Sequence, residues 1–84
     1  MDFYMVFNSR ERCMRAERLL QSRGIAAAVT PTPAGAGSAC QLSLRLDAGQ
    51  KSDAYTAVMR SGLQAGVKGC FVQDGLRLFR TACQ

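Results

Sequence analysis

The chain has 84 residues, of which 48% are apolar, and it carries a formal net charge of +5. This length excludes a second domain with a core of its own, and the apolar content excludes a disordered chain. We therefore expect one domain over residues 1–84, with a core unit over 3–73, an added strand over 76–80 and a frayed tail over 81–84.

The positive charge comes from 11 Lys and Arg residues against 6 Asp and Glu residues. Such an excess serves solubility, or affinity for an anion, an acidic protein or a nucleic acid. No apolar run approaches the ~20 residues that cross a membrane, and the amino-terminal residues lack the pattern of a signal peptide. We therefore expect a cytoplasmic protein, with no membrane partner, in which the four cysteines are reduced thiols.

The first residues predict a strand followed by a helix. Residues 3–7 are apolar and aromatic, as in a buried strand. Asn8 and Glu11 have the spacing of a helix N-cap and its reciprocal partner, with Ser9 as a competing cap. Gly24 ends the helix in a left-handed conformation. The apolar stripe of this helix consists of Cys13, Ala16, Leu19 and Leu20.

A second strand over 25–30 meets Pro31 and Pro33, which remove donors from the ladder, so it must end there or lie at a sheet edge. The third strand, 40–46, is the clearest in the chain because apolar and polar residues alternate strictly along it. The inward set is Cys40, Leu42, Leu44 and Leu46, and the outward set is Gln41, Ser43 and Arg45.

The remaining chain predicts a second helix and a hairpin. Ser52 is the expected cap of this helix, which ends at residues 61–62. A fourth strand over 67–73 contains Gly69, which indicates a bulge or a close approach. Asp74-Gly75 is a two-residue hairpin signal that leads into the added strand.

The element order predicts an α+β fold, a ferredoxin-like βαββαβ sandwich with two helices on one face of an antiparallel sheet and an extra carboxy-terminal hairpin strand. The other face of the sheet would remain partly open. Phe3 or Tyr4 exposed there would favour a homodimer or another partner.

The residue types restrict the chemistry. The chain has no histidine, which excludes a Cys-His nucleophile pair and removes the commonest metal ligand. No Cys-x-x-Cys spacing occurs, so we expect no metal and no cofactor. RNA binding through the open sheet is disfavoured, because the third strand carries no aromatic residue.

Three of the four cysteines have ordinary explanations. Cys13 lies on the apolar stripe of the first helix and packs as a small hydrophobe. Cys70, which follows Gly69, is expected to pack in the core. The alternative is that Cys70 is a second reactive thiol. Cys83 lies in the tail and is expected to be incidental.

Cys40 closes the Pro/Gly-rich segment 31–40, and two interpretations of it stay open. Its phase with Leu42 and Leu44 favours a packed core residue. Against this, Cys40 lies at the start of a strand, where burial is often incomplete. The backbone of residues 35–39 before it can turn successive N–H groups toward one point. Such a nest stabilises a thiolate and lowers the pKa of a thiol. The residues of this expected site are Gly35, Gly37, Ser38, Ala39, Cys40 and Gln41.

The chain also resembles the selenium/sulfur carrier protein-like family over about residues 3–73. The resemblance starts with Phe7-Asn8-Ser9 before a helix containing Ala16-Glu17-Arg18-Leu19-Leu20, and it continues through Pro31-Thr32-Pro33 and Ser38-Ala39-Cys40. The chain departs from the family pattern at Ala34, where the family has arginine, and at Gln41, where it has glycine.

The resemblance implies a non-enzymatic carrier whose Cys40 thiol accepts sulfur or selenium from a donor protein and passes it to an acceptor. The alternative is a non-catalytic module that binds a small anion or a protein and in which Cys40 is only structural. Nucleic acid is disfavoured as a partner under both interpretations.

Overall fold

The computed structural model describes residues 1–36 and 42–83 of the chain. In chain order the elements are β1 (Asp2–Phe7), α1 (Arg10–Ser22), β2 (Ala28–Pro31), β3 (Leu42–Asp47), η1 (Ala48–Gln50), α2 (Lys51–Arg60), η2 (Leu63–Gly66), β4 (Val67–Asp74) and β5 (Arg77–Thr81), where η marks a 3-10 helix. Within these residues, no helix is long and apolar enough to cross a membrane.

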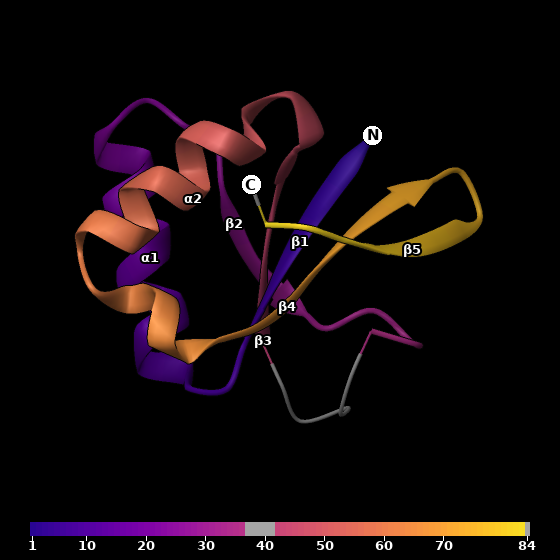
Figure 1. Cartoon of the computed structure of the whole chain (residues 1–84), viewed down its shortest axis with the longest axis horizontal. Helices are drawn as coiled ribbons and strands as arrows, with labels where there is room; N and C mark the ends of the chain where they lie inside the picture. Colours follow the sequence, from indigo (N-terminus) through magenta and orange to yellow (C-terminus); the bar gives the residue numbers. More distant parts are fainter. Residues whose placement is uncertain (37–41, 84) are drawn as a thin grey trace.

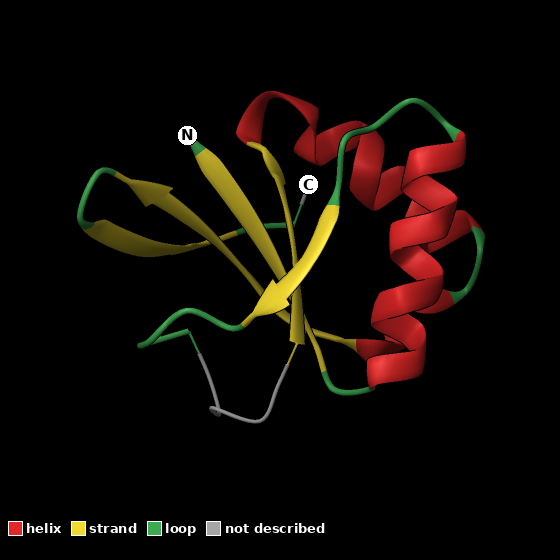
Figure 2. Ribbon diagram, turned by 180° about the vertical axis from the view of Figure 1, so that it is seen from behind, coloured by secondary structure: helices red, strands yellow, loops and turns green. Residues whose placement is uncertain are grey.

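The strands form one antiparallel five-stranded sheet in the order β2-β3-β1-β4-β5. Both helices lie on the same side of it (Figure 1), and the view from behind shows the start of the 31–36 segment leaving the end of β2 near the opposite side (Figure 2). The α+β prediction, with two helices on a sheet that gains a carboxy-terminal hairpin strand, is confirmed.

The two ends of α1 show how the sequence sets its length. Ser9, rather than Asn8, is the N-cap, and its hydroxyl accepts a hydrogen bond from the Arg12 N–H at 3.3 Å. At the other end Gly24 has a φ of +79°, as predicted. The N–H of Ile25 then bonds the carbonyl of Leu20 at 2.9 Å, which is the longer of the two bonds of a Schellman motif.

The second helix begins differently from the prediction. Ser52 lies inside α2, and the N-cap residue Gln50 makes no side-chain capping bond. The polar cap stands earlier in the chain, where Asp47 Oδ2 accepts a hydrogen bond from the Gly49 N–H at 2.9 Å at the start of η1. Because η1 runs directly into α2, the helical turn is already started before Lys51.

The main core lies between the helices and the sheet. It is built from alternate residues of the strands and from the predicted stripe of α1, of which Cys13, Ala16 and Leu20 are fully buried and Leu19 is partly buried. The strand residues in it include Phe3, Met5, Phe7, Leu44, Leu46 and Cys70. Leu42, Leu44 and Leu46 of β3 therefore face the core, as the alternation predicts.

The opposite face of the sheet is covered by a smaller cluster, and the expectation that it exposes Phe3 or Tyr4 is wrong. Phe3 is 0% exposed on the helix side, and Tyr4 is only 8% exposed on the other side. Tyr4 packs there with Val6, Ala36 and Phe71, and Leu78 of β5 adds to the cluster. These two aromatic residues therefore offer no exposed surface for a homodimer.

The β4–β5 hairpin confirms the role of Gly69 and shifts the predicted turn by one residue. The register between β1 and β4 changes beside Gly69, and a Cβ atom on Gly69 would lie 3.3 Å from Nη2 of Arg80. Asp74 pairs with Arg77, so the two loop residues are Gly75, with a φ of +63°, and Leu76. Glycine at the first loop position is the requirement of a type II′ turn.

The carboxy-terminal tail is held by a disulfide between Cys70 and Cys83, with an S–S distance of 2.04 Å. The expectations of four reduced thiols, an incidental Cys83 and a frayed tail are therefore wrong. The reason is long-range: β5 pairs Thr81 with Cys70, and the chain then turns Cys83 onto the helix side of the sheet, against the main core.

Candidate functional site at the Pro/Gly-rich segment

The first part of the Pro/Gly-rich segment forms a tight turn. The Ala36 N–H donates a hydrogen bond to the Pro33 carbonyl at 3.1 Å, and Gly35 between them has a φ of +87°. A positive φ at the third residue of a turn is the requirement of type II, which glycine meets without strain. Because the Ala36 N–H is used inside this turn, it is not free to point at a bound anion.

A buried hydrogen bond anchors the start of this segment to β3. The hydroxyls of Thr32 and Ser43 lie 2.8 Å apart, and Ser43 is 0% exposed. The alternation along β3 predicts that Ser43 faces away from the helices and is exposed to solvent. The predicted face is correct, but Ser43 is buried there rather than exposed. A buried hydroxyl without a partner is costly, so Thr32 and Ser43 stabilise each other in this position.

A second anchor is apolar. Ala36 is 7% exposed, and it packs with Tyr4, Val6 and Phe71 in the cluster on the far face of the sheet. The segment 31–36 therefore crosses from the edge strand β2 over this face. It is attached to the sheet by a polar contact at Thr32 and by an apolar contact at Ala36 before residues 37–41 follow. Sequence reasoning missed these attachments, although Thr32 between two prolines was a visible signal.

The expected site residues are only partly within the described residues. Gly35 forms the corner of the turn. Gly37, Ser38, Ala39, Cys40 and Gln41 lie outside the described residues. The structure thus gives the two ends of the segment, at Ala36 and at Leu42, and leaves the role of the expected nest as a prediction.

The other three cysteines have defined states. Cys13 is 0% exposed, and its pKa is raised from 9.0 to about 12, first by burial and second by the charge of Glu17. A thiol with that pKa stays protonated and unreactive at neutral pH. Cys70 and Cys83 are joined in the disulfide. The alternative of a second reactive thiol at Cys70 is therefore wrong.

Arginine side chains lie close to this covered face. The Arg80 guanidinium carbon stands 5.7 Å from the ring centre of Phe71, a cation–π contact. In the register of the sheet Arg45, Tyr4, Phe71 and Arg80 form one row across β3, β1, β4 and β5. Two aromatic residues, Tyr4 of β1 and Phe71 of β4, thus occupy the centre of this face, although β3 carries none. Both rings are nearly buried, so they are not available to stack on RNA bases.

The described residues contain no group of three or more His, Cys, Asp or Glu side chains placed to hold a metal ion. The buried polar side-chain atoms within the same residues all have hydrogen-bond partners. The far face of the sheet therefore combines a segment attached at Thr32 and Ala36, satisfied polar groups and nearby cations.

One of the comparisons with known proteins identifies a family. The model of the family described as "Putative Se/S carrier protein-like" matches residues 2–66, which include β1, both helices and the whole Pro/Gly-rich segment. The chain belongs to this family. No curated protein and no solved structure matched the chain.

Proposed function

We propose that this protein is a small sulfur or selenium carrier, not an enzyme, which uses the thiol of Cys40. Family membership supports the class of function. In this proposal the arrangement β1-α1-β2-β3-α2-β4 is a ferredoxin-like scaffold to which β5 is added. Its purpose is to attach both ends of the segment that carries the thiol.

The observation that carries the proposal is the state of the other cysteines. A carrier needs a thiolate that a donor protein can reach. Cys13 is buried with a raised pKa, and Cys70 and Cys83 are bound to each other. By elimination, Cys40 is the cysteine left to do this chemistry.

The proposed transfer needs no oxidant. The Cys40 thiolate attacks the outer sulfur of a persulfide on a donor protein, which forms the new S–S bond of a Cys40 persulfide. The donor S–S bond breaks, and the donor thiolate leaves with the electron pair. The acceptor protein then attacks the outer sulfur of Cys40 in the same way, and the Cys40 thiolate is regenerated.

In this proposal Ser38 and the backbone N–H groups of residues 37–41 stabilise the thiolate. Ala34 takes the place of the arginine that the family has near the thiol, and Gln41 takes the place of a glycine. Backbone groups and the Ser38 hydroxyl would therefore provide most of the activation, since these two side chains supply no positive charge.

The test is incubation of the desalted protein, with its Cys70–Cys83 disulfide left intact, with a cysteine desulfurase and cysteine, followed by intact mass spectrometry. We expect an adduct with the mass of one sulfur atom on the native protein and none on Cys40→Ala. Cys13→Ala serves as the control for loss of a buried thiol and should keep the adduct. An equal adduct on Cys40→Ala would rule out the proposed thiol.

A pair of glycine variants tests the role of the turn. Gly35→Ala and Gly75→Ala both place alanine at a positive φ with no atom within 4 Å of the new Cβ, so their backbone costs are matched. We expect the rate of adduct formation to fall for Gly35→Ala and to stay unchanged for Gly75→Ala. The rate of alkylation against pH measures the pKa of Cys40 directly. A value at or above the unperturbed ~8.5 would instead support the module in which Cys40 is structural.

A further inference from the structure

A pocket of about 520 Å³ lies at the end of the sheet away from the Pro/Gly-rich segment. It exists because the pairing of β2 with β3 stops at Ala28 and Arg45, whereas β1 stays paired with β3 as far as Asp2 and Asp47. Two strand residues of β3, Leu46 and Asp47, therefore face the gap. The volume is within the usual range of ligand pockets, roughly 300–1,000 Å³.

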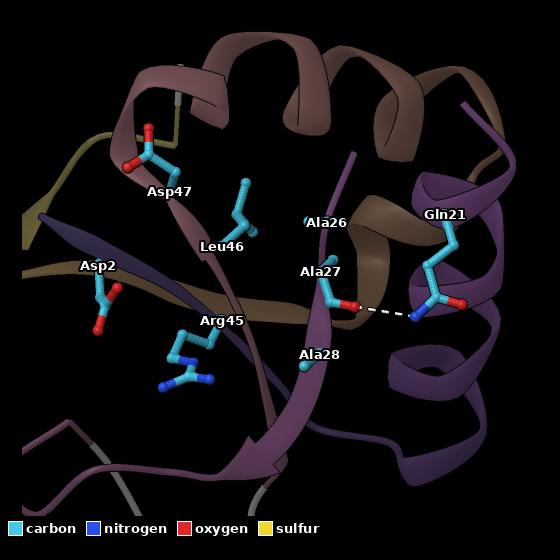
Figure 3. Close-up of a pocket in the computed structure, with 8 residues that line it drawn as sticks. All are labelled: Asp2, Gln21, Ala26, Ala27, Ala28, Arg45, Leu46 and Asp47. Atoms are coloured by element: carbon cyan, nitrogen blue, oxygen red, sulfur yellow. Dashed lines mark hydrogen bonds between the residues drawn. The ribbon is translucent and has the colours of Figure 1, made fainter. Parts of the chain in front are cut away.

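Side chains of α1 hold the outer wall of this pocket in place. Gln21 Nε2 donates a hydrogen bond to the Ala27 carbonyl at 3.0 Å, as Figure 3 shows. Two residues further on, Glu17 Oε2 accepts a hydrogen bond from the Val29 N–H at 2.8 Å. These two bonds satisfy one carbonyl and one N–H on the outer side of this segment and fix it against α1, so the gap beside β3 is a built feature rather than a frayed end.

The pocket contains charges of both signs on neighbouring strands. Asp2 and Asp47 are direct cross-strand partners, and their carboxylates point in opposite directions (Figure 3). Arg45 lies on the same face of β3, two residues before Asp47, and its side chain extends in the same direction as that of Asp2 (Figure 3). Yet in the part of the chain that the structure describes, Arg45 forms no ion pair.

The carboxylates differ in what they already bind. One oxygen of Asp47 accepts the Gly49 N–H, which leaves its other oxygen for a ligand. Asp2 makes no side-chain bond within the described residues. The rest of the wall is small and apolar, since Ala26 and Ala28 expose their methyl groups beside the charged residues. The guanidinium of Arg45, the carboxylate of Asp2 and a wall of methyl groups thus border one space, and Asp47 lines its far end.

We propose that this pocket binds a free α-amino acid. Its carboxylate would accept the fork of N–H groups of Arg45, the geometry that guanidinium groups favour. Its ammonium would lie against Asp2, whose side chain extends in the same direction as that of Arg45 (Figure 3), and its side chain would lie on the alanine wall. A simple anion would meet Asp2, and a simple cation would meet Arg45, so a ligand with both charges fits best. This site is independent of Cys40.

Titration with L-alanine, followed by the amide ¹H–¹⁵N spectrum of the protein, tests the proposal. We expect saturable shifts at residues 26–28 and 46–47, with a Kd on the order of 1 mM for so small a ligand. N-acetyl-L-alanine, which lacks the ammonium, and L-alanine amide, which lacks the carboxylate, should each bind at least about tenfold more weakly. Equal shifts with either analogue, or shifts that never saturate, would overturn the proposal.

Two variants remove one charge each from exposed positions and should leave the fold intact. Arg45→Gln and Asp2→Asn should each weaken L-alanine about tenfold. Arg18→Gln, at an exposed position on α1 that does not line the pocket, should leave the Kd unchanged. If Arg45→Gln binds L-alanine as the native protein does, the shifts do not report the proposed site and the assignment is wrong.

Discussion

The disulfide between Cys70 and Cys83 makes the sharpest prediction about stability. The two cysteines are 13 residues apart in the sequence. In the chain-entropy account, a crosslink that closes a loop of this size stabilises the folded state by about 3 kcal/mol, because it restricts the unfolded chain. A domain of this size has a total free energy of unfolding of about 4–13 kcal/mol, so the loss would be easy to measure.

The perturbation is Cys83→Ala, which leaves the buried Cys70 in place and avoids a cavity in the main core. We expect the free energy of unfolding to fall by about 3 kcal/mol and the melting temperature to fall by about 12–24 °C. The assay is urea unfolding followed by circular dichroism, with and without a thiol reductant. The native protein with reductant should match Cys83→Ala, and the variant itself should not respond to reductant.

The reasoning would be refuted by two results. One is a native protein whose unfolding midpoint does not move with reductant under conditions in which both thiols become alkylated. The other is a loss confined to faster amide hydrogen exchange in β5 with no change in global stability. That outcome would mean that β5 opens independently of the core.

Three further predictions concern two buried side chains. Ser43→Ala should lower the free energy of unfolding by about 1 kcal/mol, since it removes the hydroxyl bond to Thr32 from a fully buried position; urea unfolding against the native protein measures this, and an unchanged midpoint would contradict it. Cys13 should resist alkylation in the folded protein at pH 8 and react only in denaturant, because its pKa of about 12 keeps it protonated. The pKa of Cys13 is raised above the unfolded value of 9.0, so the contribution of the protonated thiol to stability is present below about pH 9 and is lost as the pH rises toward 12. Unfolding of the native protein and of Cys13→Ala at stepped pH values would show this loss in the native protein alone.

Local patterns in the sequence predicted the elements that depend on neighbours in the chain. The stripe of α1 places Cys13, Ala16 and Leu20 in the core, and Gly24 ends the helix because the left-handed conformation there is cheap only for glycine. The alternation along β3 correctly separated its two faces. Gly69 was correctly singled out, since both a register shift and a close arginine occur beside it.

The errors come from contacts between segments that are distant in the sequence. Alternation says which face Ser43 and Tyr4 occupy, but it does not say what covers that face. The residues that cover it are Ala36, which follows the edge strand β2, and Leu78 of β5, the strand at the opposite edge of the sheet. The pairing of Cys70 with Cys83 likewise depends on the register of a hairpin. Sequence reasoning treated the four cysteines separately and so had no means of pairing them.

These long-range contacts change how the Pro/Gly-rich segment is understood. Its glycines looked alike in the sequence, as flexible residues around one thiol. In the structure Gly35 is the corner of a defined turn, and Thr32 and Ala36 on either side of that turn are attached to the sheet. In the proposed function, attachment of this kind would lower the entropy that must be lost when a donor protein engages the segment. By the resemblance described above, Ala34 takes the place of an arginine, a change that would remove a charge from this turn but not its geometry. We therefore expect the chain to retain the position of the thiol and to depend on backbone groups for its reactivity.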